Sequence, residues 1–434
     1  MEPKEPEATP KIEEKVEEVK AESQPEPKVE GKEAENPEQK DQGDYNINPN
    51  HFSNDTGKEV DYDHLIKQFG CQKLTPELIE RFEKVIGKPM HHLIRRGKFV
   101  SHRDFDIFLD KFEKGAPIYL YTGRGPSSAS MHMGHLLPFI VTKWLQDVFQ
   151  CPTVIQLTDD EKYFYQKDEK PQDLEVFSNF ADENAKDIIA CGFDPELTFI
   201  FKDTEYIQEL YPAVTKLQKA LTYNQIKGIF GLTGSENIGK SAFPPVQAAP
   251  CISTSFPHTF GRDPKKMAFC LIPHGIDQDP YFRMTRDLAA RLKFPKPHSI
   301  HSKFFPGLKG FHSKMSASDP SSAIFLTDTP KEIKTKINSF AFSGGKATVE
   351  EHRKFGADLE VDIPYNYLQF FLEDDKQLEE IGEKYKKGEM LTGEVKKILI
   401  DCITSLVQKH QAARSLVTKE TLAKFMTPRL LKKL

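Results

Sequence analysis

The segment Pro117-Ile-Tyr-Leu-Tyr-Thr-Gly-Arg-Gly-Pro-Ser-Ser-Ala-Ser-Met-His132 decides the fold class. Its first five residues are a bulky apolar run that is typical of a buried strand, and a turn rich in Gly, Pro and Ser follows. An apolar stretch over residues 134–149 then predicts a helix, and a second apolar run over 153–158 predicts a strand. Strand, turn, helix and strand form a βαβ unit, which predicts an α/β fold with a Rossmann-like parallel sheet.

The turn in this segment is a candidate phosphate site, because parallel sheets bind ligands at the carboxyl ends of their strands. Small residues let the backbone approach a ligand, and the start of the next helix offers unpaired N–H groups. His132 and His135 add hydrogen-bond donors at the same place. Because the Gly-Lys-Ser/Thr of a Walker loop is missing, the positive charge has to come from elsewhere in the chain.

A second element, Phe311-His-Ser-Lys-Met-Ser-Ala-Ser318, supplies a candidate cation at Lys314. A lysine flanked by serines in a loop suits a clamp on a polyphosphate leaving group, since an ammonium group can follow the charge as it develops. His132 and Lys314 are 182 residues apart, which leaves room for a nucleotide-binding fold with an insertion.

The charge of the chain is unevenly distributed. The formal net charge is −5, but residues 1–45 alone hold 15 acidic side chains and seven lysines and have no aromatic residue before Tyr45. Such a segment cannot bury enough apolar surface to fold, so we expect a disordered acidic tail whose role is open. The remaining chain has a net charge of +3, which is compatible with a nucleic-acid partner.

The rest of the chain divides into three predicted regions. Residues 46–105 are an appended N-terminal subdomain, in which Thr75, Pro76 and Gly87 mark the start and end of a helix. Residues 106–329 are the catalytic domain with an insertion at about 165–265. Residues 330–434 are an all-helical domain, since apolar residues recur there at helical spacing from Val395 to Val407.

Several classes of protein are excluded by composition. No run of about 18 apolar residues predicts a membrane helix, and the N-terminus lacks the apolar core of a secretory signal, so we expect a cytoplasmic protein. The six cysteines contain no Cys-x-x-Cys pair, which fits neither a zinc site nor a disulfide framework. We therefore expect reduced thiols and no protein-bound metal. The cysteines are Cys71, Cys151, Cys191, Cys251, Cys270 and Cys402.

The two phosphate elements together resemble the HIGH and KMSKS signatures of the class I aminoacyl-tRNA synthetases. Three longer stretches, 154–162, 275–287 and 341–345, are similar to the eukaryotic cytoplasmic type of tryptophanyl-tRNA synthetase. The similarity extends over about residues 60–430. It implies that ATP activates tryptophan to an adenylate with release of pyrophosphate, and that tryptophan is then transferred to tRNA(Trp). It also implies Mg²⁺ with the ATP, a homodimer, and a helical domain that reads the anticodon.

The resemblance also implies roles for individual residues. Lys314 and Ser316 close over the pyrophosphate, and His132 and His135 contact the phosphates. The second lysine of KMSKS is replaced by Ala317, so Lys314 carries the cationic role alone. The further residues expected to bind ATP are Arg124, Gly134, Lys162, Gln278 and Met315. Those expected to bind tryptophan are Tyr121 and Gln156 at the indole, Glu161, Gln247 and Gln278 at the ammonium group, and Thr158 and Phe243 in the slot.

The residues themselves support this assignment and leave some alternatives open. An indole N–H is only a donor and needs an acceptor, and strand alternation places Gln156 and Thr158 on one face, at the carboxyl end of their strand. Simple strand packing is the alternative for Tyr121 and Thr158, and Phe243 either lines the slot or fills the core.

The competing functions are a tyrosyl-tRNA synthetase, a small nucleotidyltransferase, and a catalytically silent paralogue that acts as a binding protein. Residues 52–60, with Gly57, predict an N-terminal hairpin turn. The family often has Asp-Pro-Trp in this hairpin, and Asn48-Pro49-Asn50 here leaves open whether it caps the site.

Overall fold

A seven-stranded sheet lies at the centre of the computed structural model, which describes residues 47, 49, 59–166, 171–315 and 319–432, with only the backbone of 312–314. Within these residues the strand order is β1-β2-β7-β6-β3-β4-β5. From β7 to β5 every neighbouring pair is parallel, so the predicted α/β fold is confirmed. The strands are β1 (Gln72–Lys73), β2 (Phe99–Arg103), β3 (Ile118–Arg124), β4 (Thr153–Leu157), β5 (Thr198–Lys202), β6 (Phe269–Gly275) and β7 (His298–Ser302).

The order of the strands creates a crevice between β3 and β6. The chain proceeds from β3 outward to β4 and β5, and then returns to place β6 and β7 on the other side of β3. Loops after β3 and β6 therefore leave in opposite directions, and ligands bind in the gap between them. The helices α5 (Met133–Phe149), α7 (Leu174–Ala190) and α13 (Asp279–Leu292) connect the parallel strands.

The predicted βαβ unit is observed with small differences at its ends. Strand β3 extends three residues beyond Tyr121 to Arg124, and it pairs in parallel with β4, with Tyr121 opposite Val154. The residues of β3 alternate between two cores, because successive side chains of a strand point to opposite faces. Leu120 packs with α5 in one core, whereas Tyr119 and Tyr121 pack in the other with the segments that follow β5.

The N-terminal region is continuous with the central sheet. Strand β2 pairs antiparallel with β7, so residues expected in an appended subdomain extend the parallel sheet at one edge. The predicted helix is confirmed: α2 (Pro76–Ile86) begins after the Thr75 cap, whose side chain accepts from the Leu78 amide, and ends at Gly87 with φ 62°. The other helices here are α1 (Tyr62–Phe69), α3 (His92–Arg95) and α4 (Phe105–Glu113).

One long helix and four short ones fill the connection between β5 and β6 and cover one face of the sheet. They pack around the core that contains Tyr121, Phe243 and Tyr281. The helices are α8 (Asp203–Ala220), α9 (Tyr223–Phe230), α10 (Ile238–Ala242), α11 (Pro244–Ala248) and α12 (Pro257–Phe260), with 3₁₀ turns at Ala249–Cys251 and Ser253–Ser255. Helix α6 (Asp159–Phe164) directly follows β4, and a 3₁₀ turn at Ile276–Gln278 follows β6.

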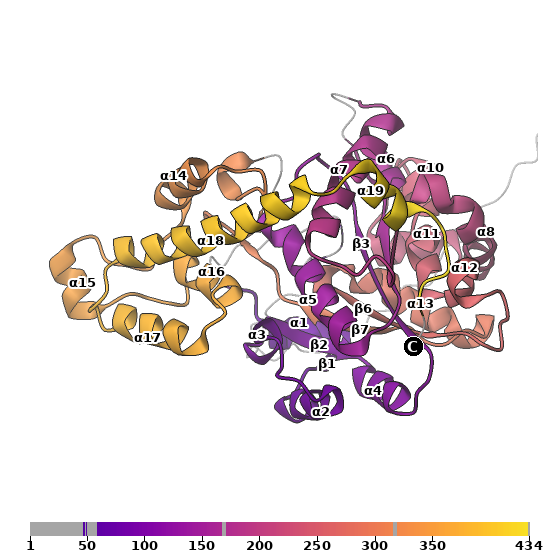
Figure 1. Cartoon of the computed structure of the whole chain (residues 1–434), viewed down its shortest axis with the longest axis horizontal. Helices are drawn as coiled ribbons and strands as arrows, with labels where there is room; N and C mark the ends of the chain where they lie inside the picture. Colours follow the sequence, from indigo (N-terminus) through magenta and orange to yellow (C-terminus); the bar gives the residue numbers. More distant parts are fainter. Residues whose placement is uncertain (1–46, 48, 50–58, 167–170, 316–318, 433–434) are drawn as a thin grey trace, which may run out of the picture. The chain divides into compact units, whose positions relative to one another are not determined.

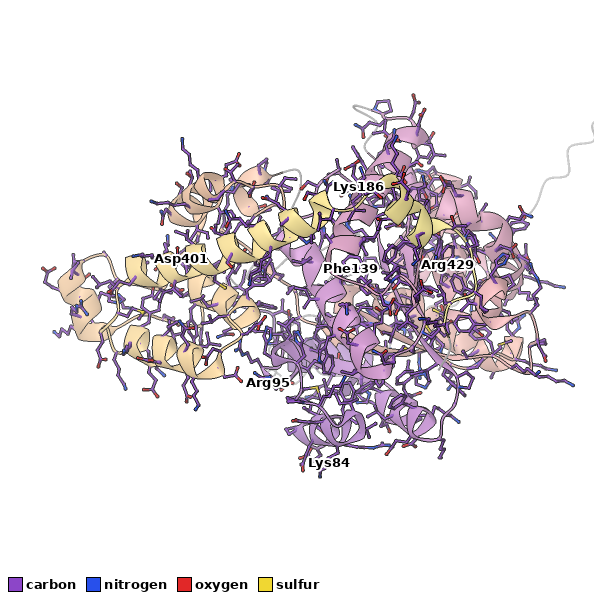
Figure 2. The ribbon with its side chains drawn as sticks, in the orientation of Figure 1. Lys84, Arg95, Phe139, Lys186, Asp401 and Arg429 are labelled. Carbon is purple, nitrogen blue, oxygen red and sulfur yellow. The ribbon has the colours of Figure 1, made fainter. Side chains whose placement is uncertain are left out.

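The C-terminal region is helical, as expected. The apolar face predicted for it is buried in α18 at Val395, Leu399, Ile403 and Val407. Figure 1 shows α18 running from the other C-terminal helices towards α7 and α19, and Lys186, labelled in Figure 2, lies on α7 near the end of α18. The elements are the hairpin β8 (Pro306–Gly307) and β9 (Gly310–Lys314), a 3₁₀ turn at Pro320–Ser322, and α14 (Pro330–Phe340), α15 (Val349–Phe355), α16 (Ile363–Phe371), α17 (Asp375–Lys386), α18 (Thr392–Ser415) and α19 (Lys419–Met426).

Polar contacts join α18 to the sheet domain. His410 lies 3.2 Å from the Asp187 carboxylate of α7, and Arg414 pairs with Glu183 of the same helix at 2.5 Å. In the described ranges, no helix combines the length and the apolar character that crossing a bilayer requires. All six cysteines are free thiols, as their spacing predicts. The predicted acidic tail and the turn at 52–57 lie outside the described residues.

Candidate active site

A cavity of about 340 Å³ opens at the crevice between β3 and β6. Its walls come from the ends of β3, β4, β6 and β7, from the start of α5 and from the segment before β8. Most of the predicted site residues line it, namely Arg124, His132, Gly134, His135, Thr158, Glu161, Lys162, Gln247, Gln278 and Met315. Pro49 also lines it, so the N-terminal segment reaches the cavity. Residues that are far apart in sequence thus meet where the strand order predicts a ligand.

His132 and His135 form a stacked pair at the start of α5. His132 is the extended residue before the helix, and the two ring centroids lie 3.5 Å apart with an interplanar angle of 21°. Burial lowers the pKa of His132 to about 3, and burial together with Arg124 holds the pKa of His135 well below its usual value. Both rings are therefore neutral near pH 7, and each can donate one hydrogen bond to an oxygen of a ligand.

Arg124, at the end of β3, forms no ion pair within the described part of the chain, although Glu161 and Asp187 lie near enough to favour its charged form. Its Nη1 donates to the Gly125 carbonyl, but its buried Nε and Nη2 have no hydrogen-bond partner among the described residues. Burial lowers its pKa to about 10, so the guanidinium remains charged at neutral pH. A buried charge with free donors is costly unless a ligand pairs with it. The cavity therefore offers a site for an anionic group beside the two histidines.

Two glycines allow side chains to approach the turn. A Cβ at Gly125 would lie 2.1 Å from Lys162 Cε and 2.8 Å from a Glu161 carboxylate oxygen. A Cβ at Gly134 would lie 3.3 Å from the His132 ring. Glycine at these positions therefore leaves room for the cation, the carboxylate and the imidazole that line the cavity.

A carboxylate and a lysine follow β4 on α6. Glu161 accepts a hydrogen bond from the Thr158 hydroxyl at 2.7 Å and pairs with Lys162 at 3.1 Å. Thr158 is 2% exposed, and it lines the cavity as its position at a strand end predicts. Because Glu161 is held by two partners and still faces the cavity, it can receive a cationic group, whereas Lys162 can receive an anionic one.

Tyr121, Gln156 and Gln247 are joined by hydrogen bonds next to the cavity. The Tyr121 hydroxyl lies 2.5 Å from Gln156 Oε1 and 2.9 Å from the Gln247 carbonyl oxygen, and it accepts from Gln247 Nε2 at 3.0 Å. Tyr121 and Gln156 are both 0% exposed and lie behind the cavity wall, whereas Gln247 lines it. This arrangement holds an amide oxygen and a phenol oxygen ready for a buried N–H donor.

The structure does not place three of the predicted site residues, Phe243, Lys314 and Ser316, in the cavity wall. Phe243 is 1% exposed and fills the core. Its ring packs edge-on against the ring of Tyr281, with the two centroids 5.9 Å apart. Phe243 directly precedes α11, whose first residues, Pro244 and Pro245, are also buried. It is absent from the residues that line the cavity. Lys314 ends β9, and only its backbone is described, while Ser316 lies outside the described residues.

Two polar groups beside the site residues, Asp160 and Asp203, were not predicted from the sequence. Gln156 Nε2 donates to Asp203 Oδ1 at 2.7 Å, and the Asp160 side chain lies within hydrogen-bonding reach of Asp203. Asp203 follows β5 and Asp160 follows β4. Their positions directly after parallel strands could have indicated this, because polar residues at such positions gather at one edge of the sheet.

These features define a nucleotide-binding α/β protein whose crevice combines an unpaired buried cation with a neutral histidine pair. The family profile described as "tRNA synthetases class I (W and Y)" matches residues 113–408. The chain belongs to this family of class I tRNA synthetases.

Individual relatives cover most of the chain. It is 58% identical over 379 residues to the cytoplasmic tryptophan–tRNA ligase of Mus musculus, which covers 87% of this chain and 78% of the relative. The corresponding protein of Homo sapiens is 56% identical, covering 89% and 81%. The crystal structure of tryptophanyl-tRNA synthetase from Plasmodium falciparum is 51% identical, covers 85% of this chain and 95% of that one, and has a TM-score of 0.79. The Encephalitozoon cuniculi enzyme bound to tryptophan is 42% identical, with coverage of 86% and 99% and a TM-score of 0.79.

Proposed function

We propose that the protein is a tryptophan–tRNA ligase, which uses ATP to activate tryptophan and then transfers it to tRNA(Trp). The observation that carries the proposal is a single cavity with two chemically different ends. One end holds the unpaired Arg124 cation beside His132 and His135, and the other adjoins the Tyr121–Gln156 hydrogen bond. The names of the Mus musculus and Homo sapiens relatives support the choice of tryptophan.

The activation step needs positioning and charge stabilisation. The tryptophan carboxylate attacks the α-phosphate of ATP, the bond to the β-phosphate breaks, and pyrophosphate leaves. Neutral His132 and His135 donate hydrogen bonds to phosphate oxygens, and the Arg124 guanidinium balances the negative charge of the phosphates. Because these groups are buried and held before ATP arrives, little reorganisation is needed during the reaction. Lys162 is placed for a further phosphate contact, and the Lys314 and Ser316 loop closes over the leaving pyrophosphate.

Mg²⁺ fits this site as a partner of the ATP phosphates. The donors at the phosphate end are cations and neutral imidazoles, and the Glu161 carboxylate of the cavity wall is already paired with Lys162. Mg²⁺ keeps several waters and is bound largely by phosphate oxygens in such sites, where it neutralises developing charge. The side chains of the site would therefore bind the polyphosphate, and Mg²⁺ would be bound mainly by the nucleotide.

Tryptophan recognition uses the other end of the cavity. Glu161 pairs with the α-ammonium group, and the amides of Gln247 and Gln278 accept further hydrogen bonds from it. The indole N–H donates to one of the two buried oxygens of the Tyr121–Gln156 pair, either the Tyr121 hydroxyl or Gln156 Oε1.

The remaining assignments concern tRNA, assembly and location. We place the anticodon contact in the helical region 330–434, and the catalytic chemistry in 106–329. The contacts of His410 and Arg414 with α7 give this helical region a fixed connection to the catalytic domain. The homodimer is proposed from the family resemblance alone, and the cytoplasmic location from the names of the relatives.

Amino-acid-dependent exchange of pyrophosphate into ATP tests the proposal. We expect exchange with tryptophan, at least about a hundredfold slower exchange with tyrosine, and charging of tRNA(Trp). Lys314→Ala should lower kcat of exchange, while its KM for tryptophan stays unchanged. Faster exchange with tyrosine would favour a tyrosyl-tRNA synthetase, and no exchange with any amino acid would favour a silent paralogue.

A further inference from the structure

The amide of Gln156 has a defined orientation. Its Nε2 donates to Asp203 Oδ1 at 2.7 Å and lies 3.4 Å from the Val246 carbonyl oxygen. Both of these neighbours are acceptors, so the NH₂ group must face them. Oε1 therefore faces the Tyr121 hydroxyl, which lies 2.5 Å away.

This orientation decides which ligand the pair can accept. With Oε1 towards Tyr121, the pair offers acceptor oxygens to a ligand. If the amide were reversed, an N–H would face the slot, and it would repel the indole N–H. Asp203, on the far side of Gln156, therefore determines whether the amide presents an acceptor oxygen or an N–H donor to the ligand.

The Asp203 carboxyl is completely enclosed. It is 1% exposed, and its Oδ2 is buried with no hydrogen-bond donor among the described residues. The carboxyl of Asp160 lies within hydrogen-bonding reach of it. Burial and the neighbouring charge of Asp160 raise the pKa of Asp203 well above its usual value. Whatever the protonation of this pair, Oδ1 is the oxygen that accepts from Gln156.

We propose that Asp203 is a positioning residue that selects tryptophan by holding Gln156 as an acceptor for the indole N–H. The inference rests on the proposed function, because it concerns the amino-acid end of that site. Asp203 does not line the cavity. It acts through its hydrogen bond with Gln156, without touching the substrate.

The test compares tryptophan with β-(3-benzothienyl)alanine, in which sulfur replaces the indole N–H. The readout is the ratio of kcat/KM for the two compounds in pyrophosphate exchange. For Asp203→Leu, which keeps the shape but has no acceptor, we expect the ratio to fall at least about tenfold through a higher KM for tryptophan. Asp203→Asn should keep the ratio within about threefold of the unmodified protein, because its amide oxygen can still accept from Gln156.

A matched control is Asp159→Asn. Asp159 belongs to the same buried cluster, but it accepts from the Thr204 hydroxyl at 2.5 Å, and among the described residues it forms no hydrogen bond with Gln156. Its substitution should leave the ratio unchanged. If Asp203→Leu does not fold, as judged by circular dichroism, Asp203→Ala takes its place.

The outcomes are distinct. Equal losses for tryptophan and the sulfur analogue in Asp203→Leu would show a purely structural role and overturn the inference. A loss of the ratio in Asp203→Asn as large as that in Asp203→Leu would also overturn it. Absence of tryptophan-dependent exchange in the unmodified protein would instead overturn the proposed function itself.

Discussion

The imidazole rings of His132 and His135 stack with their centroids 3.5 Å apart. Two protonated rings could not approach so closely, and burial keeps both pKa values far below neutrality. The pair therefore presents neutral donors to the phosphates of ATP. Because the rings are in contact, they should act as one unit in catalysis.

We expect His132→Ala and His135→Ala each to lower kcat of pyrophosphate exchange by about 10²-fold, the usual effect of removing one preorganised donor. The double variant should lose much less than the product of the two single effects. Steady-state exchange kinetics check this, and the exposed His258 provides a control in His258→Ala, which should keep full activity. Independent, multiplying losses would contradict a joint role.

Arg124→Met should separate function from stability. Loss of the guanidinium should raise the KM for ATP at least about tenfold, because the charge-assisted bonds to phosphate disappear. The free energy of unfolding without ATP should increase by about 1 kcal/mol, since a buried donor group without partners has been removed. Denaturant titration and exchange kinetics measure the two effects. A destabilised variant would indicate that Arg124 serves the fold.

Gly125→Ala should disturb the site and spare the fold. The new Cβ would lie 2.1 Å from Lys162 Cε, and a flexible side chain can move away at little cost to folding. The displaced Lys162 and Glu161 should raise the KM values for ATP and tryptophan about tenfold. Gly234→Ala is the matched control, because no heavy atom lies within 4 Å of its Cβ position. A similar loss in both variants would contradict the explanation.

The pH dependence of stability should depend on Asp160. Burial raises the pKa of Asp160 to about 7, with further contributions from the neighbouring Asp159 and Glu161. Between about pH 4 and pH 7 the folded state therefore binds more protons than the unfolded state, so this group lowers the free energy of unfolding as the pH rises. Asp160→Asn removes the effect. Its stability relative to the unmodified protein should increase by about 1 kcal/mol per pH unit over this range, as measured by urea unfolding at several pH values. A difference that does not change with pH would contradict the assignment.

Local patterns in the sequence were sufficient for much of the fold. Thr75, Pro76 and Gly87 fixed the ends of α2 because caps and turn residues act on their own backbone. The alternation in β4 placed Val154 in one core and Ile155 in the other. The phosphate turn and its two histidines were equally readable, because the chemistry lies in one continuous segment.

Only the tertiary structure decided the remainder, because it depends on partners that are distant in the chain. The pairing of β2 with β7, the core position of Phe243, and the lack of partners for Arg124 Nε and Nη2 leave no local pattern in the sequence. Gln156 was predicted from its strand position, but its orientation is set by Asp203, 47 residues away. The sequence alone determined which groups follow each strand, whereas packing decided which of them meet and which way they face.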